Sequence, residues 1–207
     1  MYPLALVFSS GWASGLNCYL VVLVLGIADD LHDTPQIPDV LGRWDVLAVA
    51  GFCYAMEFVA DKIPYVDSTW DAVSTFIRPT AGAVVGVLLA GQADSLNGAV
   101  AAVVGGGTAL LSHSVKAGSR LAINASPEPL SNIGASLTED AAVLAVVWLA
   151  IDHPRAAATI AAVLLAGGLI LLYLLGKVVR RGWRRWKGKA PRTTAQPGAQ
   201  PPAQPPA

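Results

Sequence analysis

The ionisable residues best placed to do chemistry lie in two polar stretches, Glu57 to Pro79 and His113 to Asp140, each between two apolar segments. If those segments cross a membrane, each charge at membrane depth costs at least about 2.5 to 3.5 kcal/mol unless it is paired or hydrated. The stretches therefore predict a central polar cavity that binds an ion, a small metabolite or a lipid headgroup. The candidate lining residues are Asp61, Lys62, Asp67, Asp71, Arg78, Lys116, Arg120, Asn124, Glu128, Glu139 and Asp140.

The spacing of these charges suggests how they meet. Glu57 and Asp61 stand four residues apart, as do Lys116 and Arg120, and residues at that spacing share one helical face. An acidic pair is thus expected to oppose a basic pair. The alternative to a binding cavity is that these charges form structural ion pairs and interfacial anchors.

A catalytic centre needs a nucleophile, a base or a metal set, and the sequence offers no such pattern. The three histidines, His32, His113 and His153, form no HExxH motif and no His and Cys pair. Asp67 and Asp71 share a helix face and could hold Mg²⁺ around a lipid pyrophosphate, but no partner spacing makes that site specific. We expect no cofactor, no metal and no enzymatic activity.

The composition indicates that these charges lie in a membrane protein. Of the 207 residues, 54% are hydrophobic and 14% are charged, against about 25% charged in soluble domains, and the mean hydropathy is +0.53. These values exclude an ordinary soluble enzyme. Two cysteines, Cys18 and Cys53, exclude a disulfide framework.

Six apolar segments predict an all-α integral membrane protein with about six transmembrane helices. The clearest runs from Ala156 to Gly176, where 21 residues carry no charge, enough to cross about 30 Å of hydrocarbon. Several of the others are short, so neighbouring helices or polar residues must complete them. These weaker segments are Leu4 to Ala28, Val46 to Ala60, Phe76 to Ala90, Leu96 to His113 and Asp140 to Ile151.

The distribution of basic residues predicts the orientation. Residues 177–190 form a basic stretch with interleaved tryptophans directly after the last span, which suits an anionic inner leaflet of membrane lipids better than nucleic acid. The carboxyl end is therefore expected inside, as is the amino end after six crossings. The predicted outward loops at 29–45, 91–95 and 152–155 hold only two basic residues, Arg43 and Arg155, as the positive-inside rule requires.

The chain divides into a membrane domain at 1–176, the basic segment and a tail at 191–207 of Pro, Ala, Gln, Thr and Gly that is expected to be disordered. Hairpins at 45–91 and 95–152 suggest a pseudo-duplication. Their polar stretches contain prolines and helix-start signals, which predict short re-entrant or interfacial helices.

Small residues in the first span favour close helix contacts. Gly11 and Gly15 form a small-xxx-small pattern, and Gly105 to Gly107 favour helix packing over a flexible break. Asn17 has two interpretations. Its amide lines the cavity, or its side chain is hydrogen-bonded locally within a helix-packing interface. The two Gly-rich faces make a homodimer plausible.

Three motifs carry a family resemblance: GWASGLNCY, EFVADKIPYVDSTWD, and KAGSRLAINASPEPLSN with LTED. Together they resemble the bacterial integral-membrane family catalogued as domain of unknown function 4126, over about Gly11 to Pro154. The resemblance implies a polytopic protein of the bacterial cytoplasmic (inner) membrane with these polar motifs as its hallmark. It implies no reaction.

The features above favour a small transporter or lipid-handling permease with a charged polar cavity. Lys116 and Arg120 favour an anionic cargo such as phosphate or a lipid headgroup. The alternative is a non-catalytic membrane scaffold or assembly protein whose charges are structural ion pairs. A lipid-modifying enzyme is the third hypothesis.

Overall fold

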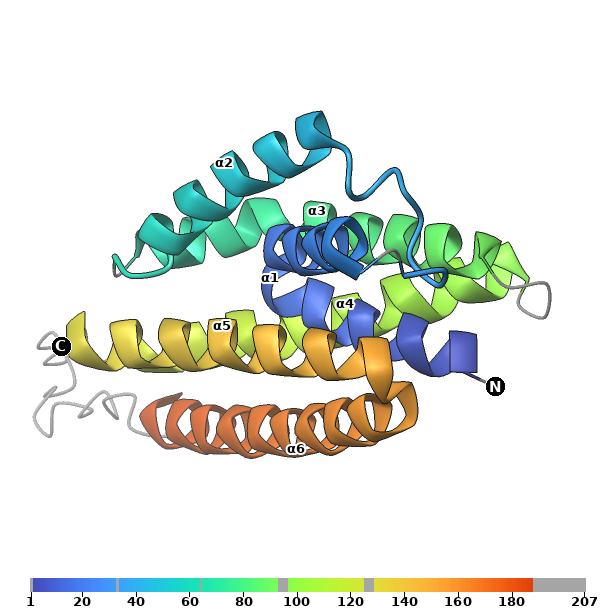
Figure 1. The fold of residues 1–207 in the computed structure, drawn as a ribbon. Helices are drawn as coiled ribbons and strands as arrows, with labels where there is room; N and C mark the ends of the chain where they lie inside the picture. The colour runs from blue at the N-terminus through green and yellow to red at the C-terminus, as the bar shows by residue number, and fades with distance from the viewer. Residues whose placement is uncertain (1, 33, 64, 93–96, 125–128, 188–207) are drawn as a thin grey trace, which may run out of the picture. The chain divides into compact units, whose positions relative to one another are not determined.

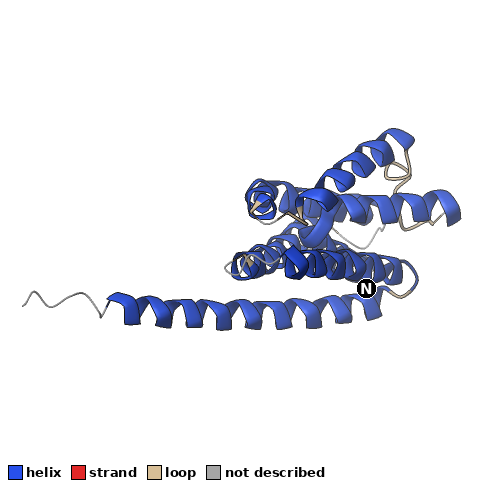
Figure 2. Ribbon diagram, turned by 90° about the vertical axis from the view of Figure 1, so that its left-hand side faces the viewer, coloured by secondary structure: helices blue, strands red, loops and turns tan. Residues whose placement is uncertain are grey.

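The computed structural model is all-α over the residues that it describes, which are 2–32, 34–63, 65–92, 97–124 and 129–187 (Figures 1 and 2). The chain divides into two units, Met1–Tyr173 and Leu174–Ala207, and the packing described below lies within the first. The helices are α1 (Tyr2–His32), α2 (Trp44–Ala60), α3 (Val66–Gly91), α4 (Gly98–Ile123), α5 (Pro129–Asp152) and α6 (Pro154–Lys187).

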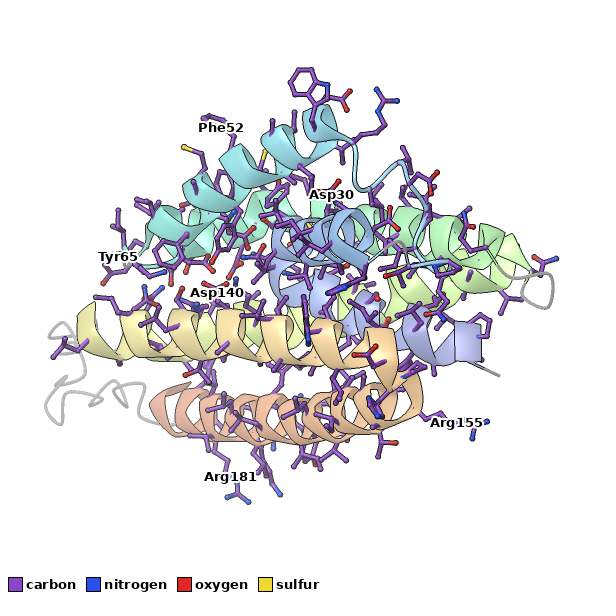
Figure 3. All side chains as sticks on the ribbon, viewed as in Figure 1. Asp30, Phe52, Tyr65, Asp140, Arg155 and Arg181 are labelled. Atoms are coloured by element: carbon purple, nitrogen blue, oxygen red, sulfur yellow. The ribbon has the colours of Figure 1, made fainter. Side chains whose placement is uncertain are left out.

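Five of these helices, α1 and α3 to α6, are long and apolar enough to cross a membrane. The exception is α2, whose 17 residues extend about 26 Å, somewhat less than the roughly 30 Å hydrocarbon core. Large apolar side chains such as Phe52, which is 68% exposed, point outward, where a bilayer would cover them (Figure 3). The chain is a multi-pass membrane protein, and a sixth crossing by α2 stays a prediction.

The centre of the first unit is α1, which packs against α2, α3, α4 and α5. Its core side chains include Val7, Val21 and Leu25, all fully buried. The most extensive single interface joins α3 to α4, across the boundary between the two proposed hairpins. The hairpin partners α4 and α5 touch each other little, because α1 lies against both.

Close approach of α1 to α4 depends on the small residues that the sequence singled out. A Cβ on Gly15 would overlap the Ser112 hydroxyl and the Ala109 carbonyl of α4, and a Cβ on Gly11 would overlap the backbone of Gly105. Gly105 itself lies against the backbone of Gly82 on α3. The prediction of a packing role is confirmed for Gly11, Gly15 and Gly105, whereas a Cβ on Gly107 would meet nothing within 4 Å.

This packing predicts different effects on stability for two glycine-to-alanine changes in the same region. Gly15→Ala should lower the free energy of unfolding by about 1–3 kcal/mol, because the added methyl group must displace α4. Gly107→Ala, where a Cβ meets nothing within 4 Å, should cause no loss. Melting temperatures of the two purified variants in one detergent test this, and equal values would contradict the close α1–α4 contact.

The separate short helices predicted in the polar stretches do not form in the described residues. Val66 to Gly91 is one helix that continues through Pro79, and α4 continues through its polar end to Ile123. The physical reason is that most charges of these stretches are buried against opposite charges, so the helices need not break to reach water.

The basic segment at 177–190 and the tail at 191–207 were predicted to follow the last span. Helix α6 continues past the apolar run into the basic segment as far as Lys187, and residues 188–190 lie outside the described part. The predicted disordered tail at 191–207 also lies outside the described residues.

Candidate functional site

The predicted acidic and basic pairs face each other. The Lys116 ammonium on α4 lies 2.5 Å from Asp61 Oδ2 and 3.5 Å from Glu57 Oε1. Arg120, one turn further along α4, has Nη2 3.8 Å from Asp61 Oδ2. All four side chains are almost fully buried. The pairing that the spacing predicted is confirmed.

A second centre forms around Arg78 of α3. Its guanidinium donates to Glu57 Oε1 at 2.6 Å and lies 3.2 Å from Asp71 Oδ1. It also contacts His113 Nδ1 at 2.9 Å, and the side chain is completely buried. Because Glu57 contacts both Arg78 and Lys116, the two centres are continuous.

A third centre joins α4 to α5 through Arg120. Its guanidinium donates to Glu139 Oε2 at 2.6 Å and to Asn132 Oδ1 at 2.7 Å, and it lies 3.8 Å from Asp67 Oδ2. Asn124 donates to both oxygens of Asp67. Glu139 Oε2 also lies 3.5 Å from the Lys116 ammonium, so this third centre is continuous with the first.

The broken middle of α1 contributes to the same region. Asn17 has non-helical backbone angles (φ −155°, ψ 94°), and its side-chain Oδ1 accepts from the Leu20 amide as a cap of the following helical segment. The carbonyls of Gly15 and Leu16, which end the preceding segment, accept from Arg78 and Lys116 respectively. Two buried cations thus satisfy the negative end of a half-helix.

Asn17 also links α1 to α5. Its Nδ2 donates to Asp140 Oδ1 at 3.1 Å, and the Asp140 side chain points inward from α5 (Figure 3). Asn17 thus combines features of both interpretations from the sequence: its Oδ1 is satisfied locally by the Leu20 amide, and its Nδ2 reaches the Asp140 carboxylate.

These contacts define what we call the ion-pair network: eight side chains connected by ion pairs of 4 Å or less. It contains three cations and five carboxylates. Fully ionised, it therefore has two more negative than positive charges. Its members are Arg78, Lys116 and Arg120 with Glu57, Asp61, Asp67, Asp71 and Glu139.

Several carboxylate oxygens of the network accept no hydrogen bond from the described residues. They are Glu57 Oε2, Asp61 Oδ1 and both oxygens of Asp71, all buried. An ionised oxygen that is buried without a donor is costly, so these atoms mark where additional positive charge would be most stabilising.

Lys62 lies at the margin of the network, between α2 and α3. Its ammonium donates to Ser136 on α5 at 3.2 Å and lies 3.0 Å from the centroid of the Phe58 ring. Partial burial lowers the pKa of Lys62 below its ordinary value, while the carboxylates of Asp140 and Asp61 oppose that shift.

The structure thus gathers the predicted site residues in one region, with one exception. Glu128 lies outside the described residues. Glu57, His113 and Asn132 belong to the region but were not among the predicted lining residues. Spacing could have identified two of them, since Glu57 precedes Asp61 by one turn and His113 precedes Lys116 by three residues. A binding role for any of these residues stays a prediction.

The two basic residues that motivated an anionic cargo are already neutralised. Each of Lys116 and Arg120 has at least two carboxylates within 4 Å, and Glu139, with 18% of its side chain exposed, is the most accessible member of the network. An anion would have to displace a carboxylate, whereas a proton or cation would relieve the surplus negative charge.

Comparison with known proteins agrees with the arrangement of apolar spans around polar motifs. A family model described as Domain of unknown function (DUF4126) matches residues 4–174, which include the whole ion-pair network. No curated protein and no solved structure matches the chain. The protein is a multi-span helical membrane protein with a buried charged network, and it belongs to the DUF4126 family.

Proposed function

We propose that the protein is a small transporter of the cytoplasmic membrane, not an enzyme, and that its ion-pair network binds a proton or a small monovalent cation as the coupling ion. The observation that carries this proposal is the surplus of carboxylates: five face three cations in a region where every member except Glu139 is almost fully buried.

A buried surplus of two negative charges is unfavourable, because an uncompensated charge loses its hydration without gaining a partner. Binding one or two positive charges removes the surplus. Purely structural ion pairs gain nothing from an unequal number of partners, so the inequality favours a binding role over the scaffold alternative.

The second support is the position of the broken helix. Discontinuous helices whose ends point at a polar centre are how many transporters form ion sites. Here Arg78 and Lys116 contact both the carbonyl end of the first half of α1 and the carboxylates. A charge bound by Asp71 or Asp61 therefore alters the groups that hold the two halves of α1 together.

The network reaches from one end of the helices toward their middle. Lys116 lies seven residues before the end of α4, about 10 Å along the axis, and Arg78 lies twelve residues after the start of α3, about 18 Å. With six crossings that end faces the cytoplasm, so we infer that the coupling ion reaches the network from the cytoplasmic side.

Cysteine labelling tests this orientation. In a chain with Cys18 and Cys53 replaced by serine, Val40→Cys should react with a membrane-impermeant maleimide in intact cells, and Ile63→Cys only after permeabilisation. The expected difference follows from a crossing by α2, which separates the two positions. Equal reactivity from the same side would mean that α2 does not cross.

The function itself is tested by flux into vesicles. Purified protein is reconstituted into liposomes that contain a pH-sensitive dye, and an imposed potassium diffusion potential drives proton entry; parallel vesicles report uptake of labelled sodium. We expect flux of one of these ions above that of empty liposomes. Correctly folded protein that moves neither ion, and moves phosphate or labelled lipid instead, would replace the cation proposal with the anionic one.

A further inference from the structure

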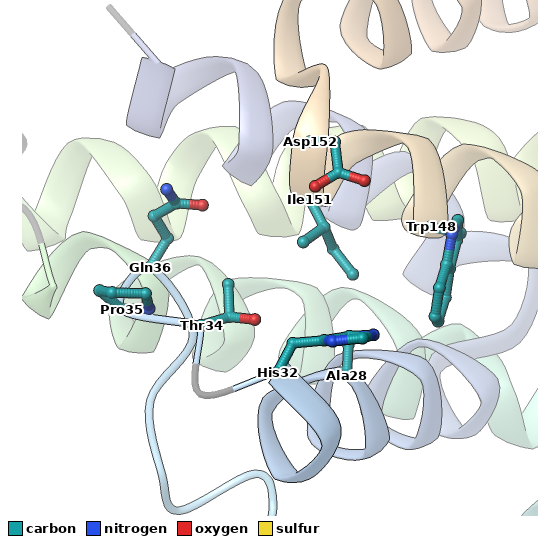
Figure 4. A pocket seen from close by; sticks show the side chains of 8 residues that line it. All are labelled: Ala28, His32, Thr34, Pro35, Gln36, Trp148, Ile151 and Asp152. Atoms are coloured by element: carbon teal, nitrogen blue, oxygen red, sulfur yellow. The ribbon is translucent and has the colours of Figure 1, made fainter.

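A cavity lies far from the ion-pair network, where α1 and α5 end. It has a volume of about 510 Å³, within the roughly 300–1,000 Å³ typical of small-molecule sites. Along α5, thirteen residues or about 20 Å separate its Asp152 from Glu139 of the network. We call it the His32–Trp148 pocket; its lining residues are Ala28, His32, Thr34, Pro35, Gln36, Trp148, Ile151 and Asp152 (Figure 4).

The pocket is built by a loop that is fixed to the helices. Ile37 and Leu41, 2% and 4% exposed, anchor the segment after α1 in the hydrophobic core. The carbonyl of Leu41 lies against Gly26, so closely that a Cβ there would overlap it. Backbone hydrogen bonds from Ile37 to Thr34 and from Leu41 to Pro38 shape the loop. The wall formed by Thr34 to Gln36 is therefore preorganised.

The electrostatics of the pocket favour a cation. Among the described residues that line it, Asp152 is the one with a formal charge, and none of them is a lysine or arginine. The carbonyl end of α1 lies at His32, which adds partial negative charge. Asp29 and Asp30 lie in the last turn of the same helix.

An aromatic surface is the second element of recognition. Trp148 is 46% exposed, and its ring is held edge to face against His32 with 6.5 Å between centroids. Figure 4 shows the indole on one side of the space and the Asp152 carboxylate on another. A tryptophan face attracts an organic cation through its quadrupole, and an adjacent carboxylate adds a Coulomb term.

The size of the space indicates an organic cation in preference to a metal ion. Within the described part of the lining, His32 and Asp152 are the only residues of the metal-ligating types, too few to enclose a metal ion. An adjoining cavity of about 380 Å³ shares Gln36, Ile151 and Asp152 with it and adds apolar walls from Leu6 and Leu89. A ligand with a charged head and an alkyl part fits this combination.

We propose that the His32–Trp148 pocket is a binding site for small alkylammonium or quaternary ammonium compounds, with Trp148 and Asp152 as the recognition residues. The site is separate from the ion-pair network, and the proposal does not depend on flux through the network.

Calorimetric titration of the detergent-purified full-length protein tests it with three probes. Choline and putrescine supply a quaternary and a primary ammonium group, and 3,3-dimethylbutan-1-ol has the shape of choline without its charge. We expect at least one of the two cations to bind, at least about tenfold more tightly than the neutral alcohol. Trp148→Leu should weaken cation binding about tenfold, whereas Trp44→Leu should not, because Trp44 is 82% exposed and does not line the pocket.

Three results of this titration would overturn the proposal. The proposal fails if neither cation binds to the folded wild type, or if the neutral alcohol binds as tightly as the tighter-binding cation. Equal losses in Trp148→Leu and Trp44→Leu would show that the binding lies elsewhere. The elution volume on size exclusion confirms that each variant is folded before titration.

Discussion

Lys116→Met is expected to lower the free energy of unfolding by about 3–5 kcal/mol, the typical cost of removing one partner from a buried ion pair. Lys116 lies within 4 Å of three carboxylates and also donates to the Leu16 carbonyl at the break in α1. Methionine retains most of the volume and removes the charge. The measurement is the melting temperature in detergent, together with the fraction that remains monodisperse.

The matched control is Lys62→Met, the same change at the margin of the network. Lys62 is partly exposed and has no ion pair within 4 Å in the described residues, so its loss should cost less than about 1 kcal/mol. The double variant Lys116→Met/Asp61→Asn should recover much of the stability, because it removes the nearest uncompensated carboxylate. Equal stabilities of the two single variants would contradict the network as a stabilising element.

Asp71→Asn is expected to separate stability from function. If the network carries a surplus of negative charge, neutralising one of its carboxylates leaves the melting temperature unchanged or higher, since Arg78 keeps its 2.6 Å contact with Glu57. The same change removes the carboxylate whose two oxygens accept no hydrogen bond from the described residues. Ion flux in the liposome assay should therefore fall by at least about tenfold.

The control for this variant is Asp45→Asn. Asp45 forms an exposed pair with Arg43, remote from the network, so both stability and flux should stay close to wild type. A structural carboxylate behaves differently: its neutralisation lowers stability and flux together. That result for Asp71→Asn would favour the scaffold alternative over the transporter.

Helix spacing was sufficient to predict a large part of the charged centre. Glu57 with Asp61 and Lys116 with Arg120 each occupy one helical face, and charges of opposite sign in an apolar chain must find each other because bare charges are too costly there. The contacts of Arg78 were harder to predict, because they depend on the depth at which α3 and α4 pack. Counting residues from a helix end does not give that depth.

Hydrophobic length and charge spacing are local properties of the chain, so they were enough to predict a multi-span helical membrane protein with mutually opposed charges. The break of α1 at Asn17 and the continuation of the polar stretches as regular helix depend instead on contacts between helices. The break is stable because Arg78 and Lys116, more than sixty residues away, satisfy the carbonyls it exposes. Partners so distant in sequence leave no periodic signal, so their effect becomes visible only when the helices are packed together.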